Sequence, residues 1–434
     1  MADLPNILYI HSHDTGRCVQ PYGHSVRTPN IQRLAEEGVI FRQAFCAAPT
    51  CSGSRACLLT GQYAHSNGMV GLAHRGFSLN DYSQHIVHAL KRHGYWSALI
   101  GEQHISKHPD IIGYDEVFKI PTNQTDHVVP VTLRLLAREH DRPFFLSVGF
   151  FETHREWFEP RSPRDANYVA PPPNLPDVPR TRADMAAFED SARALDGGMG
   201  TVLNALEANG LADNTLVICT TDHGLPFPGA KATLYDRGLG VMLIMRGPGG
   251  INGGVAIDAL VSHIDVFPTI MDLIGAERPD YLQGESLLPL VIGEQDEVRE
   301  TIFGEKTYHV AYEPERSART HRYKYIRRFD KSHPNPVLAN IDDGPSKDVI
   351  LENGWADHAI PEERLFDLLH DPQEMHNVAC EPDHADAIAD MRDRLRRWMA
   401  ETRDPLLKGP VPAPKGAVLN TPDQTSPREP TITV

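Results

Sequence analysis

The chain lacks the features that would tie it to a nucleic acid or to a membrane. Its 434 residues include 42 Lys and Arg against 58 Asp and Glu, a formal charge of −16 at pH 7. A nucleic-acid partner requires a concentrated basic surface, so this charge argues against one. No apolar run reaches the roughly 20 residues that span a bilayer, which argues against a membrane segment. An anionic substrate would therefore need a local group of cations to capture it.

Cysteine is also scarce. The chain has six, at Cys18, Cys46, Cys51, Cys57, Cys219 and Cys380. They are too few and too scattered for a disulfide framework, so Cys18, Cys46 and Cys57 are expected to be buried small residues or free thiols. The opening Met1-Ala2-Asp3-Leu4-Pro5 has no basic segment followed by an apolar one, as a signal peptide would. We therefore expect a cytoplasmic protein, or a periplasmic or secreted one if a leader was removed.

What the sequence does contain is an alternation of short apolar runs with helical stretches. Runs typical of buried strands are Asn6–Ile10, Val39–Phe41, Ser97–Ile100, Phe144–Val148, Leu216–Cys219 and Val241–Met245. Helical spacing occurs after Thr28, over Gln84–His93 and over Arg182–Ala208. This alternation predicts an α/β fold with a large, mostly parallel sheet between helices, in a main domain over residues 1–300.

The pattern changes after about residue 300. Arg322–Arg327 alternates like an antiparallel strand, and Ala385–Glu401 has the spacing of a final amphipathic helix. These features predict a smaller C-terminal α+β subdomain over residues 301–407. Residues 408–434 hold many prolines and little periodicity, so we expect an arm or a disordered tail, which could join copies of the chain into a homo-oligomer.

Polar clusters follow two of the predicted strands. His13-Asp14 comes after the first strand, and Asp222-His223 comes after Leu216–Cys219. A single Asp-His pair in a loop is more often structural or solvated. Two of them at strand ends, where α/β proteins place ligands, favour a shared site. Carboxylates together with imidazole suit a divalent cation that activates a nucleophile.

The run from Cys51 to Gly61, CSGSRACLLTG, places a thiol four residues before Arg55 on a turn of small residues. The free N–H groups of a helix N-terminus favour a negative nucleophile, and an arginine fork can hold an oxyanion. The run resembles the type I sulfatase signature C-x-P-S-R-x-x-x-L-T-G of the alkaline phosphatase superfamily. Segments 28–41, 364–367 and 371–379 extend the likeness to about Pro405. It is strongest to the heparan N-sulfatase (sulfamidase) group.

The resemblance implies a role for each matching position. Cys51 would be oxidised to formylglycine, whose hydrate is the nucleophile, and Arg55 would stabilise it. His104 would assist breakdown of the sulfated intermediate, His154 would face the leaving group, and Lys231 would bind sulfate. The implied catalytic residues are thus Cys51, Arg55, His104, His154 and Lys231. The implied metal ligands are His13, Asp14, Cys51, Asp222 and His223, with His13 either a ligand or a hydrogen-bonding residue behind the metal.

The implied activity is hydrolysis of an O- or N-sulfate, with a sugar as the expected carrier, by S–O or S–N cleavage. The implied partners are a sulfated small molecule or oligosaccharide and a formylglycine-generating maturation enzyme. One divalent metal is implied: Ca²⁺ by the family, with Mn²⁺ or Zn²⁺ as alternatives because imidazole ligands shift the preference away from calcium. Residues 1–300 would be the catalytic domain.

Two positions depart from the family pattern. Glu102 stands at the place of the first sulfate-binding lysine, where a carboxylate would repel sulfate. Glu102 therefore points away, binds a cationic part of the substrate, or pairs with a base such as Lys107. Gly53 replaces the proline or alanine that helps the unfolded segment fit the modifying enzyme. Whether Cys51 is converted to formylglycine is therefore a question that the sequence leaves open.

The remaining candidates concern substrate binding. The residues proposed to contact substrate are Glu102, Lys306, His309 and Arg316. Trp157 and Phe158 either stack on a sugar or belong to the core. Two other functions stay open: a phosphonate monoester or phosphodiester hydrolase, suggested by Asp222-His223 and Glu102, and a non-catalytic glycan-binding relative with unmodified Cys51.

Overall fold

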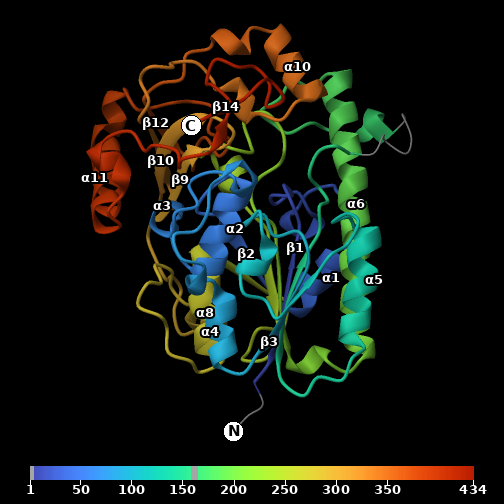
Figure 1. Ribbon diagram of the computed structural model, residues 1–434. Helices are drawn as coiled ribbons and strands as arrows, with labels where there is room; N and C mark the ends of the chain where they lie inside the picture. Colours follow the sequence, from blue (N-terminus) through green and yellow to red (C-terminus); the bar gives the residue numbers. More distant parts are fainter. Residues whose placement is uncertain (1–3, 158–164) are drawn as a thin grey trace.

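The main domain is built on an eight-stranded sheet, seen in a computed structural model that describes residues 4–157 and 165–434 (Figure 1). In sheet order the strands are β4 (Glu116–Phe118), β3 (Trp96–Gly101), β5 (Phe144–Gly149), β1 (Asn6–His11), β6 (Thr215–Thr220), β7 (Leu243–Arg246), β2 (Val39–Phe45) and β8 (Val255–Ser262). Among the described strands of this sheet, only β7 runs antiparallel to its neighbours. The predicted α/β class with a mostly parallel sheet is confirmed.

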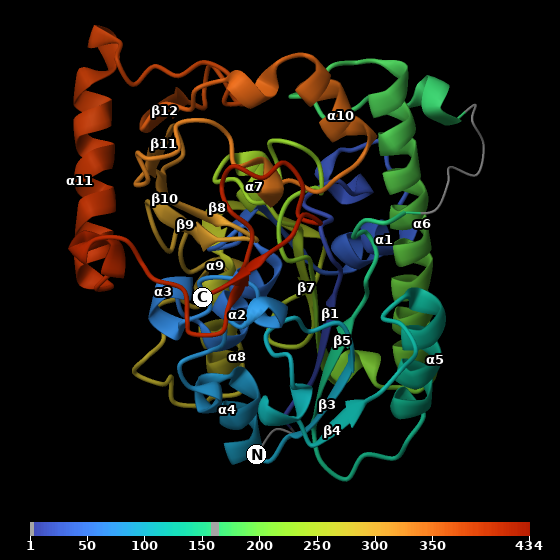
Figure 2. The ribbon, with the colours of Figure 1, turned by 45° about the horizontal axis from the view of Figure 1, so that its top comes forward.

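Helices cover both faces of this sheet. One layer contains α1 (Pro29–Glu37), α5 (Thr125–Leu136) and α6 (Pro179–Ala208); the other contains α2 (Cys51–Thr60), α4 (Ile86–Arg92) and α8 (Val266–Leu273) (Figures 1 and 2). The alternation of β1 explains the two cores, because successive side chains point to opposite faces. Ile7 lies in the core with α2, α4 and α8, whereas Leu8 lies in the core with α1, α5 and α6.

The second sheet belongs to the C-terminal part of the chain. Its four antiparallel strands, in order, are β12 (Glu363–Asp367), β11 (Tyr323–Arg328), β10 (Tyr312–Arg319) and β9 (Ile302–Tyr308). Helix α11 (Ala385–Glu401) packs on β10 and β11. The shorter helices are α3 (Ala64–Asn67), α7 (Asp236–Leu239), α9 (Leu288–Val291) and α10 (Pro345–Glu352).

The C-terminal residues 408–434 fold back onto their own chain. They contain the short pair β13 (Val418–Leu419) and β14 (Ile432–Thr433), and the side chains of Ala417 and Leu419 are buried in the core shared with α2 and α8. Figure 2 shows this red segment turning from α11 toward the middle of the molecule. Part of this segment is thus packed against the main core.

Two further sequence expectations can be compared with the structure. All six cysteines are free, and only Cys380 is exposed, as expected for thiols outside a disulfide framework. Among the described residues, no helix is both long enough and apolar enough to cross a bilayer.

Candidate active site

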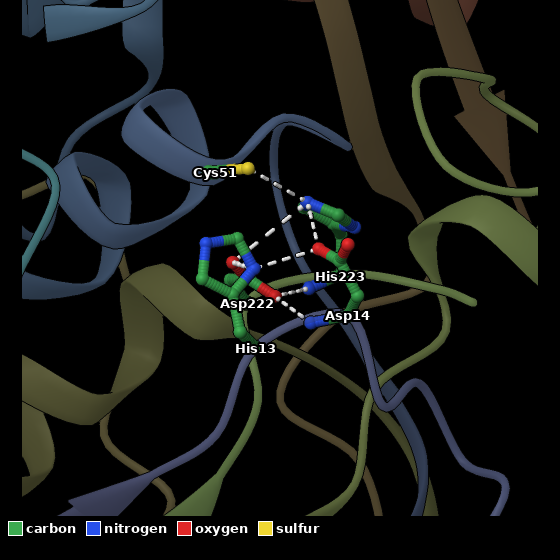
Figure 3. A group of neighbouring side chains, drawn as sticks. All are labelled: His13, Asp14, Cys51, Asp222 and His223. Atoms are coloured by element: carbon green, nitrogen blue, oxygen red, sulfur yellow. Dashed lines mark hydrogen bonds and ion pairs between the residues drawn. The ribbon is translucent and has the colours of Figure 1, made fainter. Parts of the chain in front are cut away.

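The ends of two adjacent strands bring the predicted polar clusters together. β1 and β6 pair in parallel, so the residues that follow them emerge side by side at one edge of the sheet. Figure 3 shows His13 and Asp14 after β1 facing Asp222 and His223 after β6, with Cys51 approaching from α2. The ligand atoms of these five residues all lie within 4.8 Å of one another. We call this group the strand-end cluster.

Cys51 is the first residue of α2, where the helix offers free N–H groups. Its Sγ lies 3.4 Å from Nε2 of His223. Burial by itself would raise the pKa of this thiol, but the positive charges of Lys231, His13 and His223 outweigh burial and hold the pKa well below its usual range. The site therefore stabilises a negative nucleophile at this position.

The two carboxylates of the strand-end cluster hold positive charge between them. Nδ1 of His13 lies 2.7 Å from Oδ1 of Asp14 and 3.1 Å from Oδ2 of Asp222. Burial would lower the pKa of His13, yet the neighbouring carboxylates raise it well above its usual range. A divalent ion bound here would supply the charge that the imidazolium proton supplies otherwise. Two carboxylates, two imidazoles and a thiol form a donor set that fits such an ion.

Arg55 is fixed from three sides. Its Nη1 donates to Nδ1 of His11 at 2.5 Å, and its Nη2 donates to the carbonyl of Ser12 at 2.9 Å and to Asp222 at 3.0 Å. Burial and the charge of Arg55 keep the pKa of His11 well below its usual value, so His11 is a neutral acceptor. The guanidinium is thereby oriented beside the strand-end cluster.

Lys231 connects the strand-end cluster to a residue that sequence reasoning missed. Its Nζ lies 2.8 Å from Asp14 and 2.9 Å from Asp342, and 3.4 Å from Nε2 of His154. Burial would lower the pKa of Lys231, but both carboxylates raise it well above its usual range. A lysine held this way remains charged and can attract an anion next to His154.

His104 lies beside the strand-end cluster, with its ring centroid 5.9 Å from that of His13. Its ring is stacked on His74, with Nδ1 of His74 2.8 Å from Nε2 of His104. Burial and His104 lower the pKa of His74 to about 4, so His74 is neutral at pH 7. Glu102, two residues before His104, accepts hydrogen bonds from Asn123 Nδ2 at 2.9 Å and from the backbone N–H of Gln103. Of the three alternatives for Glu102, its observed partner is thus an amide and not Lys107.

The candidate substrate residues in the C-terminal part of the chain already have partners within the protein. Lys306 is buried, pairs with Glu313 at 2.8 Å and donates to the carbonyl of Ala232, beside Lys231. His309 is bound through Nδ1 to the carbonyl of Asn340.

Arg316 has another partner set. It is fully buried, and its guanidinium binds Asp404 at 2.5 Å and Glu305 at 3.4 Å, so it is occupied by contacts within the C-terminal part of the chain. Trp157 packs against Phe188 and Phe227 in a buried cluster, while Phe158 lies outside the described residues.

Three residues of the site were not singled out from sequence: His11, His74 and Asp342. His11 stands in the polar run that ends the first strand, so that run held a usable signal. His74 and Asp342 lie in ordinary polar loops, more than 20 and more than 280 residues from Cys51 in sequence. Only the folded chain brings them to His104 and Lys231.

Comparison with known proteins decides the family. The sequence profile described as Sulfatase matches residues 5–276, well over half of the chain. The chain belongs to the sulfatase family. A second profile, described as N-sulphoglucosamine sulphohydrolase, C-terminal, matches residues 227–348. The chain is therefore an enzyme of the sulfuric ester hydrolase class, and the family implies one divalent metal ion.

Individual relatives agree with this sulfatase assignment. Human N-sulphoglucosamine sulphohydrolase is 30% identical over 93% of this chain and 92% of its own length. A structure solved with its substrate D-glucosamine-2-N,6-O-disulfate has a TM-score of 0.72 at 20% identity, covering 93% of this chain and 99% of that one. A phosphonate monoester hydrolase from Silicibacter pomeroyi has a TM-score of 0.70 at 20% identity, covering 92% and 96%. The fold is thus common to both reaction classes.

Proposed function

We propose that this sulfatase hydrolyses an N- or O-sulfate of a sugar with a formylglycine derived from Cys51, and that glucosamine N-sulfate is the first substrate to test. The observation that carries the proposal is the convergence of Cys51 with four other ligand groups within 4.8 Å. The C-terminal profile named for N-sulphoglucosamine sulphohydrolase spans Lys231 and Asp342, which lie together at the site. This match favours an N-sulfate.

The proposed reaction assigns a task to each residue. A hydroxyl oxygen of the hydrated residue 51 bonds to sulfur, and the bond from sulfur to the sugar nitrogen or oxygen breaks. The leaving group takes a proton on the side of His154, and Lys231 neutralises the sulfate charge. His104 then removes the proton of the second hydroxyl, the aldehyde re-forms and sulfate leaves. Water restores the hydrate.

The strand-end cluster would hold the metal in this proposal. His13, Asp14, Asp222 and His223 are its protein ligands besides residue 51, and the ion would lower the pKa of a bound hydroxyl. With two imidazoles in the set we propose Mn²⁺ or Zn²⁺ beside Ca²⁺ as candidates. Arg55, fixed by His11 and Asp222, would orient the nucleophile.

The deciding experiment measures sulfate release from glucosamine N-sulfate, with Cys51→Ala as the test and Cys380→Ser as the matched control. Co-production with a formylglycine-generating enzyme and mass analysis of the residue-51 peptide accompany it. We expect release by the parent and by the Cys380 variant, and none by Cys51→Ala. Release by Cys51→Ala, or none by a fully converted parent on any sulfated sugar, contradicts the proposal.

One observation favours a test of a second reaction, the hydrolysis of a phosphonate monoester. The family's first sulfate-binding lysine is replaced by Glu102, and the same fold serves a phosphonate monoester hydrolase. Paired aryl sulfate and aryl phosphonate esters with the same leaving group separate the two reactions. A higher kcat/KM for the phosphonate would assign the chain to the second class.

A further inference from the structure

The C-terminal arm, defined as residues 416–434, is bound to four segments that carry or adjoin residues of the active site. These segments are the loop 72–76 with His74, the turn 308–311 with His309, the loop 339–343 with Asp342 and the loop 154–156 with His154. The four segments come from different parts of the chain, so the arm joins them only in the folded protein (Figure 2).

Arg75, next to His74, is the first anchor of the arm. Its Nη1 donates to Oδ1 of Asn420 at 2.8 Å and to the carbonyl of Val418 at 3.4 Å, and its Nη2 donates to the carbonyl of Pro427 at 3.4 Å. The side chain of Asn420 is buried, with 2% of its surface exposed. One guanidinium therefore holds both ends of a turn of the arm beside the exposed His74.

The second anchor adjoins residues that pack against the nucleophile. A small buried cluster contains Cys51, Leu72, Val310 and Ala339. The backbone N–H of Asn420 donates to the carbonyl of Val310 at 2.9 Å, and the N–H of Ala339 donates to the carbonyl of Gln424 at 3.1 Å. A single layer of residues therefore separates the arm from residue 51.

The third anchor spans two loops of the site. Oγ of Ser426 donates to Asp343 at 2.5 Å, and the guanidinium of Arg428 pairs with Glu156 and lies 4.0 Å from Asp343. Asp343 follows the Lys231 partner Asp342, and Glu156 lies two residues after His154. The arm thus bridges the loops that carry these two residues.

We propose that the arm is a wall of the substrate site that admits a sulfated sugar as a monosaccharide or as the end of a chain, and excludes internal units. Among the site residues, His74 is exposed and His154 is partly exposed, and the arm is tied beside both. An internal unit carries sugar on both sides, so its chain would have to cross this bound segment. The inference rests on the proposed function, because it concerns the substrate of that site.

The activity test compares two substrates of one chemistry, an oligosaccharide sulfated only on its terminal unit and one sulfated only on an internal unit. The variants are deletion of residues 416–434 and Asn420→Ala, with the exposed Lys415→Ala as control. We expect the internal-to-terminal ratio of kcat/KM to rise at least ~10-fold in the deletion, to rise partly in Asn420→Ala and to stay constant in the control. An unchanged ratio in the deletion overturns the wall.

A second readout does not depend on activity. In protein produced without the maturation enzyme, Cys51 is labelled with a small and with a bulky maleimide. We expect the bulky reagent to gain at least ~10-fold in rate on release of the arm, and the small one to gain less. The buried thiols that report an intact fold are Cys18, Cys46, Cys57 and Cys219.

The two readouts distinguish the possible failures. If the buried thiols react in the deletion, Asn420→Ala replaces it as the deciding variant. If Cys51 is labelled faster but neither the parent nor any variant releases sulfate, the proposed role of the arm stands and the proposed function is overturned. Sulfate release with unchanged labelling and an unchanged substrate ratio keeps the function and overturns the wall.

Discussion

Two buried groups of charged residues in this protein have similar composition and different architecture. The strand-end cluster joins residues that follow β1 and β6 with the first residue of α2. The second group, which we call the joint cluster, contains His65, Glu305 and Asp404 around Arg316. Each has acids and at least one histidine whose ligand atoms lie within 4.8 Å. Composition therefore does not separate a metal site from a structural ion pair.

The position of the permanent positive charge does separate them. In the joint cluster, Arg316 lies inside the group and binds Asp404 and Glu305, so the acids already have a cation that cannot be deprotonated. In the strand-end cluster, Arg55 and Lys231 each bind one carboxylate, Asp222 and Asp14, from outside the five-residue group. The imidazole of His13 lies between the two carboxylates, and an imidazole releases its proton when a metal binds. The joint cluster links α3, β9, β10 and the turn after α11, whereas the strand-end cluster neighbours the partly exposed His154 and His104.

The largest expected effect comes from the same substitution made in each group. Asp14→Asn removes the carboxylate that holds Lys231 and His13, so we expect kcat to fall at least ~100-fold, as for loss of one preorganised electrostatic group. Asp404→Asn leaves the activity per folded molecule unchanged. Sulfate release and the fraction folded by circular dichroism are measured together. Equal activity loss in the two variants would remove the distinction between the groups.

For the free energy of unfolding, the larger effect is expected from a change in the joint cluster. Arg316→Met leaves Glu305 and Asp404 buried without their cation, so we expect the free energy of unfolding to fall by about 3–5 kcal/mol. Arg396→Met, on an exposed pair with Asp393, is the control and should change it by less than about 0.5 kcal/mol. Urea unfolding followed by fluorescence measures both. A loss confined to activity, with stability unchanged, would contradict a structural role for Arg316.

Metal binding should distinguish the groups with a somewhat smaller effect. A divalent ion at ~100-fold above its Kd is expected to stabilise the protein by about 2.7 kcal/mol. The increment should disappear in Asp14→Ala and persist in His65→Gln. Thermal unfolding with and without the ion gives the increment, and titration calorimetry gives the number of ions. Two ions per chain, or an increment that depends on His65, would make the joint cluster a metal site too.

The smallest expected effect concerns Gly53 within α2. A Cβ there would lie 2.9 Å from Oγ1 of Thr50 and 3.1 Å from Cβ of Ala48, so crowding opposes the helix preference for alanine of about 1 kcal/mol. We expect Gly53→Ala to leave stability within about 0.5 kcal/mol and to raise the converted fraction of Cys51.

Gly197→Ala provides the matched control for this substitution. Apart from its two chain neighbours and the nearby backbone of α6 itself, no atom lies within 4 Å of a Cβ built at Gly197. We expect it to gain about 0.5–1 kcal/mol without changing conversion. Peptide mass analysis measures conversion in both variants. A converted fraction that stays the same in Gly53→Ala shows that this position does not limit maturation.

Local pattern was sufficient for much of the fold. The run Asn6–Ile10 became β1, and the helix predicted at Ala385–Glu401 is observed at the same residues, because both have clear periodicity. The strand predicted from Val241 begins only at Leu243. β8 was not predicted, because its first half is largely exposed and lacks a continuous apolar run. Contacts across the sheet decide such ends.

The chemical site was predictable where residues follow strands or belong to the cysteine motif. His13, Asp14, Asp222 and His223 come after two parallel strands, and parallel pairing alone places them together. Lys306 and Arg316 could not be assigned in this way. Their surroundings depend on acids that lie near or far in the chain, such as Glu313 and Asp404.

The sequence by itself determined the sulfatase family, the polar groups at the strand ends and the position of Cys51 at the start of a helix, because each depends on neighbours within a few residues. Only the tertiary structure decided that Asp342 meets Lys231, that His74 meets His104 and that the C-terminal arm binds segments that pack against residue 51. These contacts join segments tens to hundreds of residues apart. Their geometry follows from how the two sheets and the arm pack, and no local periodicity encodes that packing.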